Sequence, residues 1–163
     1  MQSDPIFQLP HFSILKRLAE RLSGSQIVWA VTGSLGFALH GLPVEVHDID
    51  IQSDEEGVYE IAGRMAAYMT EPVALRASDK LRSHFGRLRV NGIQMELMGA
   101  VQKRLPDGSW GLPASVNENS EVVVVDSVHF PVMKLEYEAA AYRQMGRGQK
   151  AEMIETWLAG KGR

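Results

Sequence analysis

Two short stretches decide how this chain folds: Thr32-Gly33-Ser34 and, after thirteen further residues, Asp48-Ile49-Asp50-Ile51. A small-residue turn leads into an apolar segment, and a strand then carries two acids one residue apart. Because side chains alternate faces along a strand, Asp48 and Asp50 project from the same side. Adjacent carboxylates repel each other unless a cation lies between them, and Mg²⁺ is the usual cation for such hard oxygen ligands. The stretch therefore predicts a turn, a short helix and a metal-binding strand.

The composition is that of one ordinary globular domain. The chain has 163 residues and 45% hydrophobic content, which suits a single domain over residues 1–163. It has no cysteine, so disulfides, thiolate metal sites and cysteine nucleophiles are excluded. The first residues lack the features of a signal peptide, and no apolar run approaches the roughly 20 residues of a membrane span, so we expect a cytoplasmic protein. The net charge of -3 gives no general attraction for nucleic acid or membrane.

Apolar spacing predicts alternating helices and strands in the first half of the chain. Gly24 is the expected end of the first helix, and Ser53 with Glu56 three residues on predicts a capping box for the third. The expected elements are helices at residues 14–22, 35–40 and 53–69 and strands at residues 26–31 and 46–52.

Two hairpins are expected in the second half. Asn91-Gly92, between two alternating runs, is typical of a type I′ turn, and Asp126-Ser127 is expected to connect a second pair of strands. The two-residue turn fixes the register of the first hairpin, so Arg87 faces Glu96 on its polar surface. The opposite surface is the predicted core, with Gly86, Leu88, Val90, Ile93, Met95 and Leu97.

The remaining segments complete an α/β (α+β) fold. Residues 99–120 show no periodicity and are expected to form an irregular loop, which in compact domains is often a lid or binding loop. Pro131 suits the first turn of a helix that runs to about residue 145, and a last helix covers about 149–159, giving a C-terminal helical pair over 131–160. We expect a mixed central β-sheet flanked by helices.

Each part of the acidic motif has an ordinary explanation when taken alone. Asp48 and Asp50 fit an amphipathic strand that exposes its acids to water, and Gly33-Ser34 fits a tight turn with a helix cap. Glu96 changes this balance, because it lies on the polar face of the predicted hairpin and can share a site with the aspartates. The combination favours one site over three unrelated features.

This combination resembles the nucleotidyltransferase superfamily that includes DNA polymerase beta. It is closer to the small bacterial members and the antibiotic nucleotidyltransferases, and the resemblance covers residues from about 26 to 98. It implies Mg²⁺-dependent transfer of a nucleoside monophosphate from a triphosphate such as ATP to a hydroxyl, with release of pyrophosphate. The acceptor can be a small molecule, an RNA end or a protein side chain.

The resemblance also implies a role for each residue of the motif. Asp48 and Asp50 would bridge two Mg²⁺ ions (or Mn²⁺) about 3.5–4 Å apart. Glu96 would complete the metal shell or take the proton of the hydroxyl, and the sequence leaves both roles open. Gly33 would let the backbone approach the phosphates, and Ser34 would donate its hydroxyl to them.

The sequence departs from the family pattern in its positive charges. Relatives often have an arginine shortly before the first aspartate, whereas here only His47 is available. Arg87 either forms a surface ion pair with Glu96, worth about 0.2–1 kcal/mol, or contacts phosphate once metal binds the glutamate. Arg143 and Lys150 resemble the basic residues that reach the triphosphate from the C-terminal helices of small relatives.

Some residues outside the motif, and some other functions, are alternatives to this interpretation. Trp110 can stack on a ligand ring or pin its loop to the core, and the second is favoured. His84 can act as a base but is expected to be a solvated or core-edge histidine. His40 and His47 lack metal-ligand spacing and are expected to support the metal ligands or to be structural. The missing arginine and the Arg87–Glu96 pairing leave room for a non-catalytic, antitoxin-like regulatory protein. The Asp-x-Asp motif also occurs in glycosyltransferases, although this chain is short for one.

Overall fold

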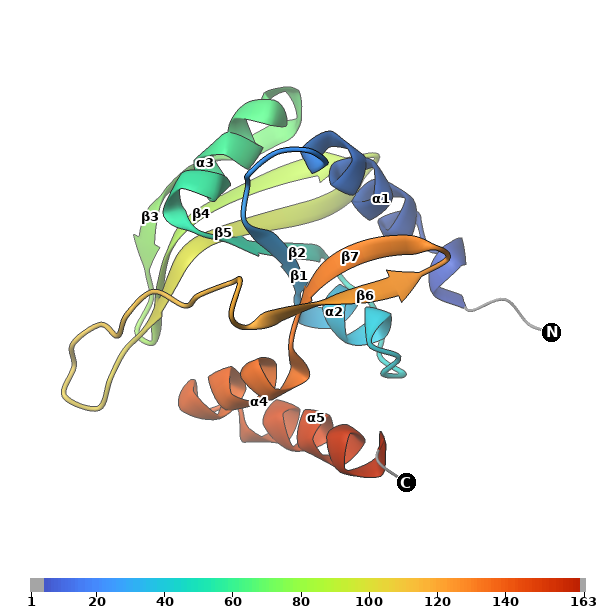
Figure 1. The fold of residues 1–163 in the computed structure, drawn as a ribbon. Coiled ribbons are helices and arrows are strands. Elements are labelled where there is room, and N and C mark those ends of the chain that lie inside the picture. Colours follow the sequence, from blue (N-terminus) through green and yellow to red (C-terminus); the bar gives the residue numbers. More distant parts are fainter. Residues whose placement is uncertain (1–4, 162–163) are drawn as a thin grey trace.

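The computed structural model of the chain describes residues 5–161 and contains one mixed β-sheet (Figure 1). Seven strands follow the order β3-β4-β5-β2-β1-β7-β6. The pairs β1–β7 and β2–β5 are parallel, and the other neighbours are antiparallel. The strands are β1 (Trp29–Thr32), β2 (Ile49–Ser53), β3 (Met69–Ala77), β4 (Leu81–Val90), β5 (Ile93–Lys103), β6 (Ser120–Val125) and β7 (Val128–Met133). The expected mixed sheet is confirmed.

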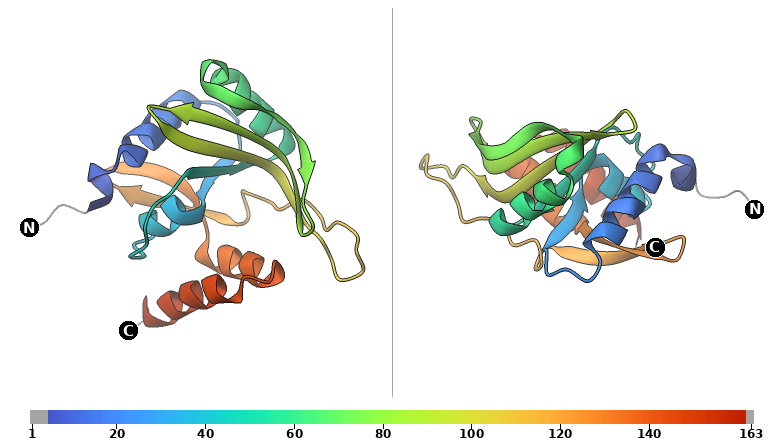
Figure 2. Two further views of the ribbon diagram at one scale, coloured as in Figure 1. Left: turned by 180° about the vertical axis from the view of Figure 1, so that it is seen from behind. Right: turned by 90° about the horizontal axis from the view of Figure 1, so that it is seen from above.

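Five α-helices surround the sheet within residues 5–161. Figures 1 and 2 show α1 and α3 on one side of it, and the antiparallel pair α4–α5 at its opposite side. The helices are α1 (Pro10–Leu22), α2 (Gly33–Leu39), α3 (Glu55–Arg64), α4 (Leu135–Gln144) and α5 (Gly148–Lys161), with 3₁₀ turns at Pro5–Gln8 and Ala66–Tyr68. The C-terminal helical pair is thus confirmed. No helix among residues 5–161 has both the length and the apolar character needed to cross a membrane.

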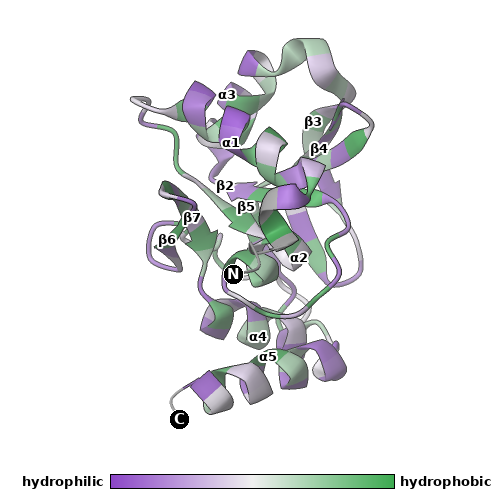
Figure 3. Cartoon of the chain, turned by 90° about the vertical axis from the view of Figure 1, so that its right-hand side faces the viewer, coloured by the Kyte–Doolittle hydropathy of each residue, from purple (hydrophilic) through white to green (hydrophobic). Residues whose placement is uncertain are grey.

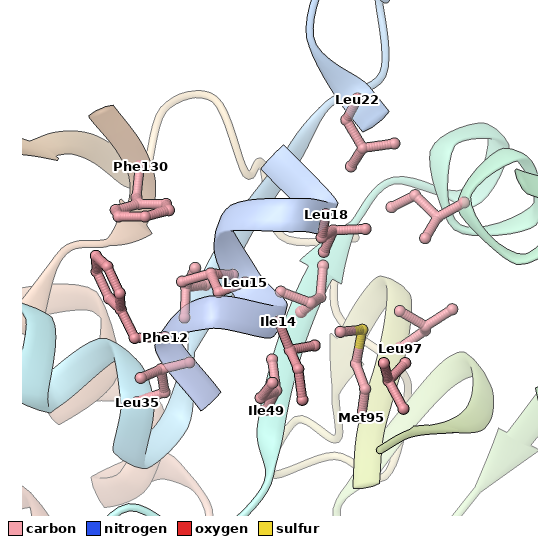
Figure 4. Packing of buried hydrophobic residues seen from close by; sticks show 14 of the residues in the cluster. Phe12, Ile14, Leu15, Leu18, Leu22, Leu35, Ile49, Met95, Leu97 and Phe130 are labelled. Carbon is pink, nitrogen blue, oxygen red and sulfur yellow. The ribbon is translucent and has the colours of Figure 1, made fainter. Parts of the chain in front are cut away.

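The main core lies on the face of the sheet covered by α1 and α3. Ile49 and Ile51 of β2 and Leu97 of β5 are completely buried there (Figure 4). Burial of each such side chain is worth about 1.5–3 kcal/mol. Helix α1 contributes the residues that helical spacing predicted, and it ends just before Gly24, which has a positive φ of 75°. Phe12 of α1 packs edge-to-face on Phe130 of β7, with ring centroids 5.6 Å apart.

A second apolar cluster fastens the C-terminal helices to the rest of the fold. It joins Phe37 of α2 and Leu42 to Leu135 and Ala139 of α4 and Ile154 of α5. Figure 3 shows hydrophilic and hydrophobic residues mixed along α4 and α5, as expected for helices that bury only one side. The pair α4–α5 is therefore held mainly through α2.

The turn chemistry gave the register of both hairpins correctly. Asn91 and Gly92 have φ values of 49° and 80°, and Arg87 pairs with Glu96 as predicted. Asp126 and Ser127 also have positive φ, 51° and 63°, and connect β6 to β7. Both turns therefore have the backbone that two-residue hairpins prefer.

Several element boundaries differ from the sequence prediction. Strand β3 was not predicted, because Met69 was placed in the preceding helix. Strand β5 continues to Lys103, so the irregular segment is shorter than residues 99–120. Pro131 lies inside β7 and does not begin a helix, which starts instead at Leu135. Pro131 pairs with Val122 of the edge strand β6.

The N-terminal cap of α3 is also one residue later than predicted. Asp54 is the cap, and its carboxylate accepts the N–H of Gly57 at 2.7 Å. Ser53 remains in β2 and donates its hydroxyl to the carbonyl of Val28. The predicted box was wrong because the serine is buried in the strand, which leaves the neighbouring aspartate to cap the helix.

Candidate active site

The turn between β1 and α2 lies directly against Asp50. β1 ends at Thr32, and Gly33 begins the helix with a φ of 71°. A Cβ atom added to Gly33 would lie only 2.4 Å from Oδ2 of Asp50. Glycine is thus required both for the backbone conformation and for this close approach. Ser34 accepts the backbone N–H of His47 at 3.0 Å, which leaves its own hydroxyl proton for another acceptor.

The parallel pairing of β2 with β5 places Asp50 beside Glu96. The two are direct partners in the register, on the face opposite the core residues Ile49 and Ile51. Asp48 lies one residue before β2, and its carboxylate accepts the side-chain N–H of Gln94 at 3.0 Å. Acids from two separate stretches of chain therefore lie on adjacent strands, as the sequence analysis expected.

The electrostatic balance at Asp50 is unfavourable for its charge. Burial, with the nearby carboxylates of Glu96, Asp48 and Glu138, raises the pKa of Asp50 to about 7, and only Lys150 opposes the shift. A carboxylate with so little compensation binds protons or cations readily. The chemistry of these oxygen donors thus fits a hard divalent cation such as Mg²⁺.

The acids are not gathered into a ready-made metal shell. Among residues 5–161, no group of three or more His, Asp or Glu side chains is arranged to hold an ion. Glu96 lies 3.5 Å from the guanidinium of Arg87, and Asp48 is held by Gln94. Asp48 and Glu96 therefore each contact a side chain other than an acid, whereas Asp50 lies among like charges. The residues fit a metal by chemistry, and their metal-binding role remains a prediction.

Arg87 forms the cross-strand ion pair considered as one of its two roles. Its guanidinium contacts Glu71 at 2.7 Å and Glu96 at 3.5 Å, and it lies over the ring of Phe85. The side chain is 41% exposed, so the pair contributes little stability. The contact of Arg87 with phosphate stays a prediction.

The basic residues of the C-terminal helices divide into two groups. Arg143 is held by both carboxylate oxygens of Glu155, at 2.5 and 2.9 Å, on an exposed surface. Lys150 acts electrostatically on Asp50 and Glu138, and burial, followed by the charge of Arg147, lowers its pKa. The structure therefore supports Lys150, and not Arg143, as the cation beside the acids.

Arg147 is a basic residue that the sequence analysis passed over. Arg147 and Lys150 both lie over the ring of Tyr142, at 5.1 and 5.3 Å, and they line a pocket of about 350 Å³ at the α4–α5 turn. Burial, with the charges of Glu138 and Asp50, raises the pKa of Tyr142 to about 12, and Arg147 opposes the shift. Tyr142 and its two cations thus belong to the electrostatic surroundings of Asp50.

Glu138 is the other residue that the sequence analysis missed. It is only 4% exposed, and its carboxylate accepts the hydroxyl of Thr32 at 2.5 Å and the N–H of Gly33 at 3.4 Å. Burial raises its pKa, and these hydrogen bonds together with Lys103 and Lys150 oppose the shift, so that the pKa lies at about 7. Its helical spacing from the buried residues of α4 was the available signal, since a charged residue on an apolar stripe needs a partner.

The remaining candidates are structural, as expected. Trp110 lies between the guanidinium groups of Arg82 and Arg104, at 5.0 and 4.2 Å from its ring centroid, which pins the loop to β4 and β5. His40 contacts the carbonyl of Met133 at 3.0 Å. His84 lies between Tyr59 and Glu55 of α3, at 2.9 and 2.7 Å, away from the acids of β2.

Comparison with known proteins agrees with this fold and site. The family model described as aminoglycoside-2″-adenylyltransferase matches residues 14–156. The crystal structure of a candidate nucleotidyltransferase from Thermotoga maritima is 42% identical, with a TM-score of 0.82, and the match covers 98% of this chain and 96% of that one. No curated protein sequence matches significantly.

Two structures of antibiotic-modifying enzymes share the fold at low identity. The lincosamide antibiotic adenylyltransferase LnuA, solved with lincomycin bound, is 12% identical with a TM-score of 0.54, over 88% of this chain and 96% of that one. ANT(2″)-Ia, solved with adenylyl-2″-tobramycin, is 11% identical with a TM-score of 0.53, over 93% and 98%.

The chain belongs to the aminoglycoside-2″-adenylyltransferase family and has a nucleotidyltransferase fold. The antibiotic-nucleotidyltransferase part of the predicted resemblance is thereby confirmed, and the wider relationship to DNA polymerase beta stays a prediction. The matches favour a nucleotidyltransferase over a glycosyltransferase.

Proposed function

We propose that this chain is a metal-dependent nucleotidyltransferase that moves a nucleoside monophosphate from a triphosphate to a hydroxyl and releases pyrophosphate. The observation that carries the proposal is the pairing of Asp50 with Glu96 on adjacent strands, with Gly33 in contact with Asp50. ATP is the proposed donor, because the family is described as adenylyltransferase.

The proposed metal ligands are Asp48, Asp50 and Glu96. Bound Mg²⁺ or Mn²⁺ would neutralise phosphate charge and acidify the attacking hydroxyl. Asp50 is suited to this role because burial and neighbouring acids raise its pKa to about 7, so a cation relieves a repulsion already present. Glu96 would serve either as a metal ligand or as the acceptor of the hydroxyl proton, the two roles that the sequence leaves open.

Other residues of this chain would bind and orient the triphosphate. Gly33 lets the backbone lie close to Asp50, and the Ser34 hydroxyl can donate to a phosphate oxygen. Lys150 and Arg147 supply positive charge from the α4–α5 turn. In the transfer, the acceptor oxygen would form a bond to the α-phosphorus while the bond from that phosphorus to the bridging oxygen breaks and pyrophosphate leaves. The hydroxyl proton would pass to Glu96, or to water where Glu96 is a metal ligand.

We propose a hydroxyl-bearing small molecule as the acceptor. LnuA and ANT(2″)-Ia are solved with lincomycin and with adenylyl-2″-tobramycin, respectively. Hydroxyl-bearing antibiotics are therefore the first acceptors to test. An RNA 3′ end and a protein side chain are the competing acceptors.

The experiment uses α-³²P-labelled ATP with Mg²⁺ and separate acceptors: lincomycin, tobramycin, total RNA and unlabelled protein extract. The wild-type protein is expected to label one acceptor, and Asp50→Asn is expected to lose the labelling. Asp126→Asn is the matched control, because Asp126 is an exposed turn residue at a positive φ that asparagine tolerates. Labelling by Asp50→Asn at the wild-type rate would overturn the proposal.

A non-catalytic regulatory protein is the second candidate function. It is favoured by the contact between Arg87 and Glu96 and by the lack of a ready-made metal shell among residues 5–161. Calorimetry separates the two candidates. Binding of ATP that requires Mg²⁺ supports the enzyme, and no heat at millimolar ATP supports the regulatory protein.

A further inference from the structure

Glu138 is a buried carboxylate that the proposed reaction does not use. It lies in the first turn of α4, between Leu135 and Ala139, on the stripe that packs against α2. The other buried residues of this stripe are apolar. Position 138 instead takes a charge into the interior, where it accepts hydrogen bonds from Thr32 and Gly33.

These hydrogen bonds connect distant parts of the chain at the candidate site. Thr32 is the last residue of β1, and Gly33 is the first of α2, whereas Glu138 belongs to the helix that leads to Arg147 and Lys150. Thr32 is 6% exposed, so water does not compete for its hydroxyl. The contact therefore ties the helical pair to the turn beside the acids.

The position of the Thr32–Gly33 turn determines the space beside the Asp50 carboxylate. The space between Gly33 and Asp50 is too small for even a methyl group, since an added Cβ would come within 2.4 Å of Oδ2. A small displacement of the turn therefore changes the room available beside this carboxylate. Glu138 fixes that turn with two directional hydrogen bonds, which an apolar side chain at the same position would not supply.

Burial of a carboxylate is unfavourable unless hydrogen bonds and opposite charges compensate it. Here the compensation comes from Thr32, Gly33 and the charges of Lys103 and Lys150. An apolar residue would satisfy the packing against α2 without this requirement. The charge at position 138 is therefore explained by the geometry that it imposes and not by docking of the helix.

We propose that Glu138 is a positioning residue, which holds the Thr32–Gly33 turn against Asp50 and keeps the basic α4–α5 turn facing it. The inference rests on the proposed function, because its consequence is measured on nucleotide binding. Loss of the contact lets the turn and the helical pair shift relative to each other, so the affinity for the triphosphate falls.

The test compares Mg²⁺–ATP binding by calorimetry among variants that a thermal melt shows to be folded. Thr32→Val removes the hydroxyl while keeping the shape of the side chain, and it is expected to weaken binding about tenfold, or about 1.4 kcal/mol. Thr32→Ser keeps the hydroxyl and is expected to bind within about twofold of wild type. Glu138→Gln is expected to weaken binding as much as Thr32→Val does. The double variant is expected to bind no more weakly than whichever single variant binds more weakly, because both changes remove the same contact.

The control is Glu136→Gln, which removes an exposed charge from the same helix and is expected to leave binding unchanged. Wild-type affinity in both Thr32→Val and Glu138→Gln would overturn the inference, as would tighter binding by Glu138→Gln, which would make Glu138 only a repulsive charge. If Thr32→Val does not fold, Glu138→Gln and Thr32→Ser decide the question. Failure of the wild-type protein to bind Mg²⁺–ATP would instead overturn the proposed function and the inference with it.

Discussion

The two faces of the central sheet differ although the same strands build them. On one face, Ile49 and Ile51 of β2 and Leu97 of β5 are fully buried beneath α1 and α3. On the other, Asp50 and Glu96 of the same strands lie side by side, and among the charges around Asp50 only Lys150 opposes the repulsion. The first face stabilises the fold, whereas the second holds charges that the fold alone does not need.

This difference shows how a two-residue repeat separates stability from chemistry. Because neighbouring residues in a strand face opposite sides, one short stretch can serve the core and the site at once. It follows that substitutions at adjacent positions of β2 should have opposite consequences. The acidic face should affect activity and the apolar face stability.

Asp50→Asn should have the largest effect. We expect transfer to fall at least about a thousandfold, because a neutral amide cannot replace a charged metal ligand. The unfolding free energy should not decrease, since burial opposes the charge of Asp50 in the folded protein. The labelling assay and a urea titration measure the two quantities on the same preparation.

Ile51→Ala should have the reverse pattern. Removing a fully buried side chain should lower the unfolding free energy by about 3 kcal/mol. The folded fraction should still bind Mg²⁺–ATP with near wild-type affinity, because Ile51 lies on the other face from the acids. Binding measured at a temperature where the variant is folded checks this, and a loss of affinity without unfolding would break the comparison.

Asp50 on the acidic face and the buried Glu138 should both contribute to the pH dependence of stability, and Asp50→Asn isolates the contribution of Asp50. The pKa of Asp50 is raised from 3.8 to about 7 in the folded protein, so the folded state holds a proton that the unfolded state releases in that interval. Stability of the metal-free protein should therefore fall as pH rises from about 4 to 7. Asp50→Asn removes this contribution, and its advantage over wild type should grow by about 2 kcal/mol between pH 5 and pH 8.

Urea titrations in EDTA at the two pH values measure that advantage. Adding Mg²⁺ at pH 8 should stabilise the wild type and leave Asp50→Asn unchanged, because a ligand that binds only the folded state shifts unfolding. If Asp50→Asn exceeded the wild type in unfolding free energy by the same amount at both pH values, Asp50 would not be a group with a raised pKa.

The smallest expected effect separates the two groups of cations on the C-terminal helices. Lys150→Gln should weaken Mg²⁺–ATP binding about tenfold, because Lys150 faces Asp50 and the proposed phosphate site. Arg143→Gln is the matched control, since Arg143 is already paired with Glu155. Equal losses in both variants would mean that only the net charge of the helices matters.

The sequence was sufficient wherever the determining interactions were local. Asn91-Gly92 gave the hairpin turn, and that turn gave the pairing of Arg87 with Glu96. The alternation of Asp and Ile in β2 gave the two faces of the sheet. In each case a few adjacent residues fix the backbone, so no distant contact was needed to predict it.

The sequence was insufficient where distant contacts decide. Strand β3 carries charges at Glu71 and Arg76 and forms because β4 lies beside it, so its own pattern is weak. The partner of Glu138 is Thr32, more than one hundred residues earlier, and the partner of Arg143 is Glu155 on the next helix. A sequence names such residues as charged but does not say which of them meet.

The most direct test of the proposed metal site is to determine where a manganese ion binds. A crystal grown with Mn²⁺ and a non-hydrolysable ATP analogue would locate the ion by its anomalous scattering. We predict anomalous density at the carboxylates of Asp48 and Asp50, with Glu96 released from Arg87 to join them. Manganese bound elsewhere, with Asp50 left without an ion, would contradict the account.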